Sequence, residues 1–161
     1  MEGVRFLSFV DVVAIHALCI GQHGGSDGLR DEHLLRSALS QPETSFEGDY
    51  LHSSLWEMAA AYLFHLSQNQ AFVDGNKRTA VLTAVTFLWL NDQLIGGRDD
   101  ELYDLVIGFA ERRRTKAEAA AWFEEHRSPS MVPPATMIKM LSGQDPFSEQ
   151  DPFSEQDPSE E

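Results

Sequence analysis

Apolar residues recur at spacings of three and four through most of the first 125 positions, and such spacings place side chains on one face of an α-helix. They predict six helices, at about residues 8–21, 31–40, 53–68, 76–90, 99–113 and 115–125. Ser8 and Asp11 have the spacing of a capping box at the start of the first helix. Residues 41–50 are polar, contain Pro42 and are predicted to form a loop. Strand-like alternation is nearly absent, so the pattern predicts an all-α fold.

The fourth predicted helix differs from the others because its body, TAVLTAVTFLWL at 79–90, is apolar nearly all round. A helix without a polar face is usually buried on every side. We therefore expect a compact bundle of about six helices around this buried central helix.

The end of the chain is a short repeat. DPFSEQ at 145–150 recurs at 151–156 and is followed by DPSEE. Proline at every sixth position and a scarcity of apolar residues disfavour helix, strand and core. We divide the chain into a helical domain, residues 1–127, and a disordered acidic tail, residues 128–161, in which a helical turn at 137–141 could dock.

Charge and composition narrow the classes of function. Lys and Arg number 12 against 26 Asp and Glu, a formal net charge of −14, which argues against a general nucleic-acid binder. The single Cys19 cannot form an internal disulfide. No apolar run reaches the length of a membrane span, and no secretory signal is evident. The expectation is a cytoplasmic protein with neither nucleic acid nor membrane as a partner.

Candidate chemistry lies in QAFVDGNKR, residues 70–78, just before the buried helix. Gly75 permits a positive φ at the helix entry, and the first turn contains Asn76, Lys77 and Arg78. Unpaired backbone N–H groups and the helix dipole make such a start an anion site, to which the two side chains add positive charge. Asp74 offers a hard oxygen ligand suited to Mg²⁺. The segment therefore predicts phosphate and Mg²⁺ at a helix N-terminus.

A plainer interpretation of the same residues is available. Asp74 could cap the helix, Gly75 could serve only the turn, and Lys77 and Arg78 could be solvated. Two cations at the positive end of a helix dipole are unfavourable, however, which favours a bound anion as their reason.

The segment resembles the signature of the Fic/Doc family, H-x-F-x-D/N-G/A-N-K/G-R. The matching positions are Phe72, Asp74, Gly75, Asn76, Lys77 and Arg78. The resemblance extends over roughly residues 4–126 and includes Gly24-Gly25 and the GLR at 28–30. Lys77 stands where AMP-transferring members have Gly, so the chain looks like the death-on-curing, or Doc, branch.

This resemblance implies a catalytic set of Gln70, Asp74, Lys77 and Arg78. It implies that the Gly75 amide, Asn76, Lys77 and Arg78 hold the phosphates of ATP and that Asp74 holds Mg²⁺. One position departs from the family, because Gln70 replaces the motif His, and a Gln amide cannot usefully accept a proton. Gln70 could orient the acceptor hydroxyl while Asp74 or the phosphate takes its proton.

The remaining histidines are interpreted as structural. His65, five residues before Gln70, is expected to be a core or surface histidine rather than a substitute base. Four others show no metal-ligand spacing: His16, His23, His33 and His52.

Two classes of function follow from the resemblance. The first is a Doc-like toxin that transfers a phosphoryl group from ATP to a hydroxyl of elongation factor Tu. Its partner would be a small Phd-like antitoxin whose C-terminal segment binds a groove of the toxin. The second is a catalytically impaired member that binds a nucleotide or a protein, as Gln70 suggests. AMP transfer is a lesser alternative, against which Lys77 argues.

Overall fold

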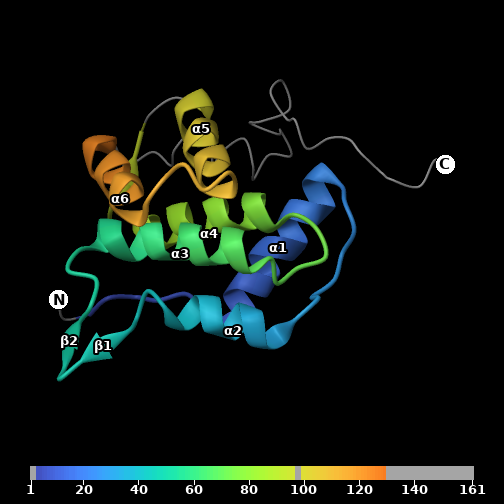
Figure 1. Cartoon of the computed structure of the whole chain (residues 1–161), viewed down its shortest axis with the longest axis horizontal. Helices are drawn as coiled ribbons and strands as arrows, with labels where there is room; N and C mark the ends of the chain where they lie inside the picture. Colours follow the sequence, from blue (N-terminus) through green and yellow to red (C-terminus); the bar gives the residue numbers. More distant parts are fainter. Residues whose placement is uncertain (1–2, 97–98, 130–161) are drawn as a thin grey trace.

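The computed structural model describes residues 3–96 and 99–129, which form a helical bundle (Figure 1). Its helices are α1 (Phe9–His23), α2 (Glu32–Ser40), α3 (Leu55–Asn69), α4 (Asn76–Leu90), α5 (Asp99–Ala110) and α6 (Lys116–Glu125). Its strands are β1 (Ser45–Phe46), β2 (Asp49–Tyr50), β3 (Leu94–Ile95) and β4 (Arg127–Ser128). The all-α prediction is confirmed, and the bounds of α4 coincide with the predicted range.

Side chains of polar residues define where most helices begin. The Ser8 N–H donates to Asp11 Oδ2 over 2.7 Å while the Asp11 N–H donates to Ser8 Oγ over 3.2 Å, which confirms the predicted capping box. Thr115 and Glu118 form a second capping box at α6. Helix α4 has no side-chain cap and begins at Gly75 instead. Its start therefore offers backbone N–H groups of the first turn to other partners.

The centre of the bundle consists of α3 and α4, which run side by side (Figure 1). Helix α2 packs on one side of α3, whereas α5 and α6 pack on the other. Helix α1 packs against α4. Nine residues of α4 are buried, from Thr79 to Leu88. The prediction of a buried fourth helix is confirmed, and α3 shares its central place.

The short strands are where the structure differs from the sequence pattern. Residues 45–50 form a β1–β2 hairpin rather than an open loop. Its turn residues Glu47 and Gly48 have φ values of 52° and 93°, the left-handed conformation that a two-residue hairpin turn requires. Strand β4 pairs with β3, with Leu94 opposite Ser128, so it crosses the division placed after residue 127. Strands of two residues are too short to show alternation.

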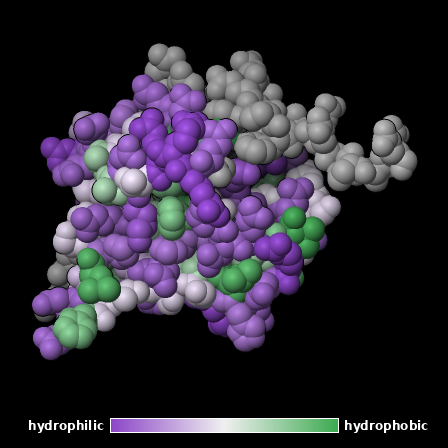
Figure 2. Space-filling view, viewed as in Figure 1, coloured by the Kyte–Doolittle hydropathy of each residue, from purple (hydrophilic) through white to green (hydrophobic). Residues whose placement is uncertain are grey.

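The surface drawn in Figure 2 is largely hydrophilic, with separate apolar spots. Exposed large apolar residues include Val10, Phe46, Leu51 and Val73. Across the described part of the chain, no helix combines the length and apolarity of a membrane span. The predicted tail from residue 130 onward, including the turn at 137–141, lies outside the described residues.

Candidate active site at the start of helix α4

The loop between α3 and α4, residues 70–75, is called the motif loop here. Both of its ends are left-handed: Gln70 has φ 46° and ψ 51°, and Gly75 has φ 74° and ψ 16°. A Cβ on Gly75 would lie 3.2 Å from Ile20 Cδ1, so glycine also suits the packing there. For Gln70 the left-handed conformation is unfavourable and requires support from its surroundings.

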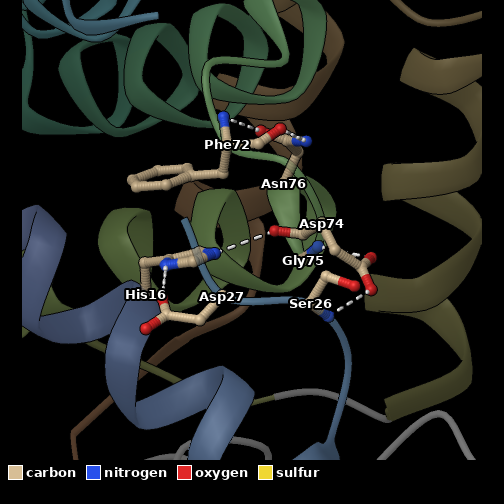
Figure 3. Close-up of polar contacts among 7 residues, drawn as sticks. All are labelled: His16, Ser26, Asp27, Phe72, Asp74, Gly75 and Asn76. Carbon is tan, nitrogen blue, oxygen red and sulfur yellow. Dashed lines mark hydrogen bonds and ion pairs between the residues drawn. The ribbon is translucent and has the colours of Figure 1, made fainter. Parts of the chain in front are cut away.

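Asn76 closes the motif loop with its side chain. The Phe72 N–H donates to Asn76 Oδ1, and Asn76 Nδ2 donates to the Phe72 carbonyl, each over 3.0 Å (Figure 3). Sequence reasoning placed Asn76 among the phosphate ligands, whereas the structure engages both ends of its amide with the loop. The group that Asn76 presents at the helix start is its backbone N–H.

Asp74 is exposed, and each oxygen of its carboxylate accepts one backbone hydrogen bond. The Gly75 N–H donates to Oδ1 over 2.7 Å, and the Ser26 N–H donates to Oδ2 over 3.2 Å (Figure 3). Ser26 belongs to residues 24–30, called the glycine loop here. A Cβ on Gly25 would lie 2.5 Å from Asp74 Oδ2, so the close approach of the two loops requires glycine at this position.

The carboxylate of Asp74 fits the role of a Mg²⁺ ligand. Two hydrogen bonds leave lone pairs on both oxygens, since a carboxylate accepts at about four sites. Within residues 3–96 and 99–129 no group of three or more His, Cys, Asp or Glu could hold a metal ion. Mg²⁺ commonly takes one or two carboxylates and completes its shell with water and phosphate oxygens. Asp74 therefore suits an ion that arrives with a nucleotide.

Lys77 and Arg78 stand in the first turn of α4, and both are partly buried. Burial raises the pKa of the Cys19 thiol of α1 to about 11, so the thiol is uncharged near neutral pH; the positive charge of Arg78 only partly opposes this increase. The structure therefore places both predicted cations in the first turn of α4.

Arg30 supports the left-handed end of the motif loop. Its Nη2 donates to the carbonyl oxygens of Gln70 over 2.5 Å and Asn69 over 3.5 Å. The backbone N–H groups of Arg30 and Asp31 both donate to the Ala71 carbonyl, over 2.8 and 3.0 Å. The side chain of Gln70 itself is exposed. The sequence pattern included Arg30 but did not predict a role for it. Its position directly before Asp31, the N-cap of α2, was the one local feature that could have drawn attention to it.

His65 does not have the properties of a substitute base. The pKa of His65 is lowered to about 4, mainly by burial and to a lesser extent by the charges of Lys116 and His52. A group with such a pKa accepts protons poorly near neutral pH. His16, also interpreted as structural, is buried and contacts the motif loop through Asp74 and Phe72 (Figure 3).

The helical bundle and the motif loop before its buried helix α4 together identify the family of the protein. The model of the Fic/DOC family matches residues 6–88, and the chain therefore belongs to the Fic/DOC family. It is 43% identical over 110 residues to Toxin Doc of Mycolicibacterium smegmatis, an alignment covering 67% of this chain and 82% of that protein. It is 29% identical over 107 residues to Protein kinase doc of Escherichia phage P1, covering 66% and 83%. These similarities place the chain in the death-on-curing branch.

Proposed function

We propose that this protein is the toxin of a toxin–antitoxin pair and transfers a phosphoryl group from ATP to a protein hydroxyl in the cytoplasm. The proposed target is a translation factor, elongation factor Tu. One observation carries the proposal: the Asp74 carboxylate and the Gly75 N–H lie together at the uncapped start of α4. Positive charge on Lys77 and Arg78 belongs to the same helical turn.

Different residues at the start of α4 hold different parts of ATP, the phosphoryl donor. The Gly75 N–H and the first-turn N–H groups of α4 donate to phosphate oxygens, and Lys77 and Arg78 offset the phosphate charge. Asp74 holds Mg²⁺ through its carboxylate. When bound, ATP supplies the phosphoryl group, and Mg²⁺ reduces the charge that develops on the phosphates.

Gln70 orients the hydroxyl of the target protein that accepts the phosphoryl group. It is exposed at the end of α3, and its amide can accept a hydrogen bond from a target hydroxyl. Its amide does not take up the proton, which passes to Asp74 or to the phosphate itself. Phosphoryl transfer depends mainly on positioning and charge stabilisation, so the absence of a base lowers the rate without abolishing the reaction.

The names of the two relatives support the proposal. The phage P1 protein is named a protein kinase, and the Mycolicibacterium protein is named a toxin. We extend both descriptions to this chain and add a Phd-like antitoxin whose C-terminal segment occupies a groove of the toxin. The small antitoxin would keep the transferase inactive until it is removed.

A second candidate is a binding module that holds a nucleotide or a protein without turnover, and Gln70 favours it. The transferase and a module that holds a nucleotide both predict that ATP with Mg²⁺ raises the Tm and that Arg78→Ala removes most of the increase, whereas a module that holds only a protein predicts no increase. A lost charge-assisted hydrogen bond costs about 1.5–3 kcal/mol. Only the transferase labels another protein.

ATP with a radiolabelled γ-phosphate distinguishes the transferase from the binding module. The protein is incubated with labelled ATP, Mg²⁺ and purified elongation factor Tu, and in parallel with a cell lysate. The transferase predicts label on the factor that Asp74→Asn abolishes and that Asp49→Asn, an exposed aspartate of the β1–β2 hairpin, leaves unchanged. Nucleotide binding without label in either mixture would favour the binding module.

A further inference from the structure

His16 is a buried histidine of α1 whose ring lies against the motif loop. Only 2% of the residue is exposed. Its ring stacks on Phe72, with 3.9 Å between ring centroids and 5° between ring planes. Its Nε2 lies 2.8 Å from the carbonyl oxygen of Asp74 (Figure 3). The loop therefore holds the ring both by stacking and by a polar contact.

The direction of that polar contact follows from its partner. A carbonyl oxygen only accepts hydrogen bonds, so Nε2 of His16 must carry the hydrogen and donate it. On the opposite side of the ring, Nδ1 lies 3.8 Å from Asp27 Oδ1, beyond the length of a hydrogen bond. The contact that orients the loop is therefore the one from Nε2 to Asp74.

The Asp74 carbonyl belongs to the same peptide unit as the Gly75 N–H. The described part of the chain has no cis peptide bond, and in a planar trans peptide the C=O and N–H point in opposite directions. A carbonyl that faces His16 therefore turns the Gly75 N–H away from α1. There the Gly75 N–H donates to Oδ1 of the Asp74 carboxylate over 2.7 Å (Figure 3). The proposed function assigns phosphate and Mg²⁺ to the surroundings of this carboxylate.

We propose that His16 is a positioning residue: its Nε2–H hydrogen bond to the Asp74 carbonyl keeps the Gly75 N–H directed at the nucleotide phosphate. This inference rests on the proposed function. With ATP bound, the Gly75 N–H would donate to a phosphate oxygen, and the Asp74 carboxylate would be available to hold Mg²⁺. Without the His16 bond, the peptide before Gly75 can rotate because glycine tolerates many backbone conformations. A rotated peptide presents its carbonyl dipole to the phosphate and weakens binding.

Two substitutions separate the hydrogen bond from the packing. His16→Phe keeps a ring to stack on Phe72 but removes the donor, whereas His16→Gln retains an N–H donor at nearly the position of Nε2. His33→Phe, at an exposed histidine of α2, is the matched control. In each full-length protein, the ¹H–¹⁵N resonance of the Gly75 amide is followed during titration with ATP and Mg²⁺.

The expected result is a large shift of the Gly75 amide resonance in the unaltered chain, in His16→Gln and in His33→Phe. His16→Phe should lose most of this shift and bind ATP about tenfold more weakly. An equal Gly75 shift and equal affinity in His16→Phe would overturn the role of His16 and leave the proposed function intact. If the Gly75 amide and the Tm of the unaltered chain do not respond to ATP, the proposed phosphate site is wrong and this inference falls with it.

A measurement on the unaltered chain decides the matter if His16→Phe does not fold. Long-range ¹H–¹⁵N spectra of the imidazole show which ring nitrogens carry hydrogen. A proton on Nε2 of His16 is expected, and it supports the proposal together with binding by His16→Gln. A ring protonated only at Nδ1 cannot donate to the Asp74 carbonyl and would overturn the proposal.

Discussion

At the scale of single residues, position 70 combines an unusual backbone with an unusual side chain. Gln70 is left-handed, at φ 46°, and Arg30 donates to its carbonyl oxygen. The backbone is therefore held from the glycine loop while the side chain remains exposed. A different side chain can occupy this position without disturbing the core.

Gln70→His is expected to raise the rate of the proposed phosphoryl transfer. A histidine at this position would supply the missing proton acceptor, and general-base catalysis is typically worth about 10²–10⁴-fold. We expect expression of the variant to arrest growth more strongly and purified protein to label the translation factor faster. Equal, strong labelling by both forms would mean that another group accepts the proton. No labelling by either, with ATP still bound, would rule out the transferase.

His65 should make the fold sensitive to mild acid. Its pKa is about 4 in the folded chain against 6.5 for an ordinary histidine, so between these values the unfolded chain binds more protons. The stability that the neutral ring contributes is complete above pH 6.5 and is lost as the pH falls toward 4. Because the ring is only half-buried, we expect a loss of about 1–2 kcal/mol in the free energy of unfolding.

His65→Phe, which keeps a ring but cannot titrate, should flatten this dependence. Urea unfolding of both proteins at steps between pH 6.5 and pH 4 provides the measurement, and His33→Phe at an exposed position is the control. The difference between His65→Phe and the unaltered chain removes the contribution of carboxylates that titrate in the same range. Parallel pH profiles would show that His65 titrates normally in the folded state.

At the scale of elements, the site depends on two loops that meet between helices. The Val73 N–H donates to the Gly28 carbonyl over 3.0 Å, and Leu29 forms a β-bridge with Phe72. The glycine loop is thereby joined to the motif loop, and α1 and α2 are tied to the start of α4. Asp74 receives its bond from Ser26 because of this contact.

Gly25→Ala should separate these loops. The new Cβ would lie 2.5 Å from Asp74 Oδ2, and the φ of 108° is unfavourable for alanine. Gly24→Ala is the matched control, since Gly24 also has a positive φ, of 77°, but a Cβ there meets nothing within 4 Å. Both variants should lose about 1–3 kcal/mol of stability from backbone strain. Only Gly25→Ala should also weaken the binding of ATP with Mg²⁺, which calorimetry measures. Equal ATP affinities in the two variants would show that the close approach of Gly25 to Asp74 does not matter for the site.

At the scale of the whole molecule, the last described residues of the chain pair with the segment that follows α4. Strand β4 pairs with β3, and the Gly96 N–H donates to the His126 carbonyl over 2.7 Å. Leu94 and Ile95 of β3 are buried, with 8% and 3% of their surfaces exposed. Residues 127 and 128 therefore both contribute to the fold, although the predicted tail begins at residue 128.

Two truncations test where the folded unit ends. A chain that ends at Pro129 retains β4 and should melt within about 2 °C of the full chain, because the repeat sequence cannot build a core. A chain that ends at His126 loses β4 and should melt about 5 °C lower or more. Thermal unfolding followed by circular dichroism gives both values. A large loss on truncation at Pro129 would show that the later segment, such as residues 137–141, packs on the domain.

The sequence by itself determined the helices and the place of the candidate chemistry. Helical hydrogen bonds and caps join residues three or four apart, so periodicity and the Ser8–Asp11 pair predict them directly. The apolar body of α4 likewise predicted its burial, and the DGNKR segment at its start predicted an anion site.

Only the tertiary structure decided how that site is held. His16 reaches Asp74 across 58 positions, Ser26 reaches it across 48, and Arg30 reaches Gln70 across 40. No local pattern records such contacts, because each depends on how α1, α2 and the two loops pack together. The same is true of Asn76, whose place in the motif suggests a ligand while its side chain holds the Phe72 backbone.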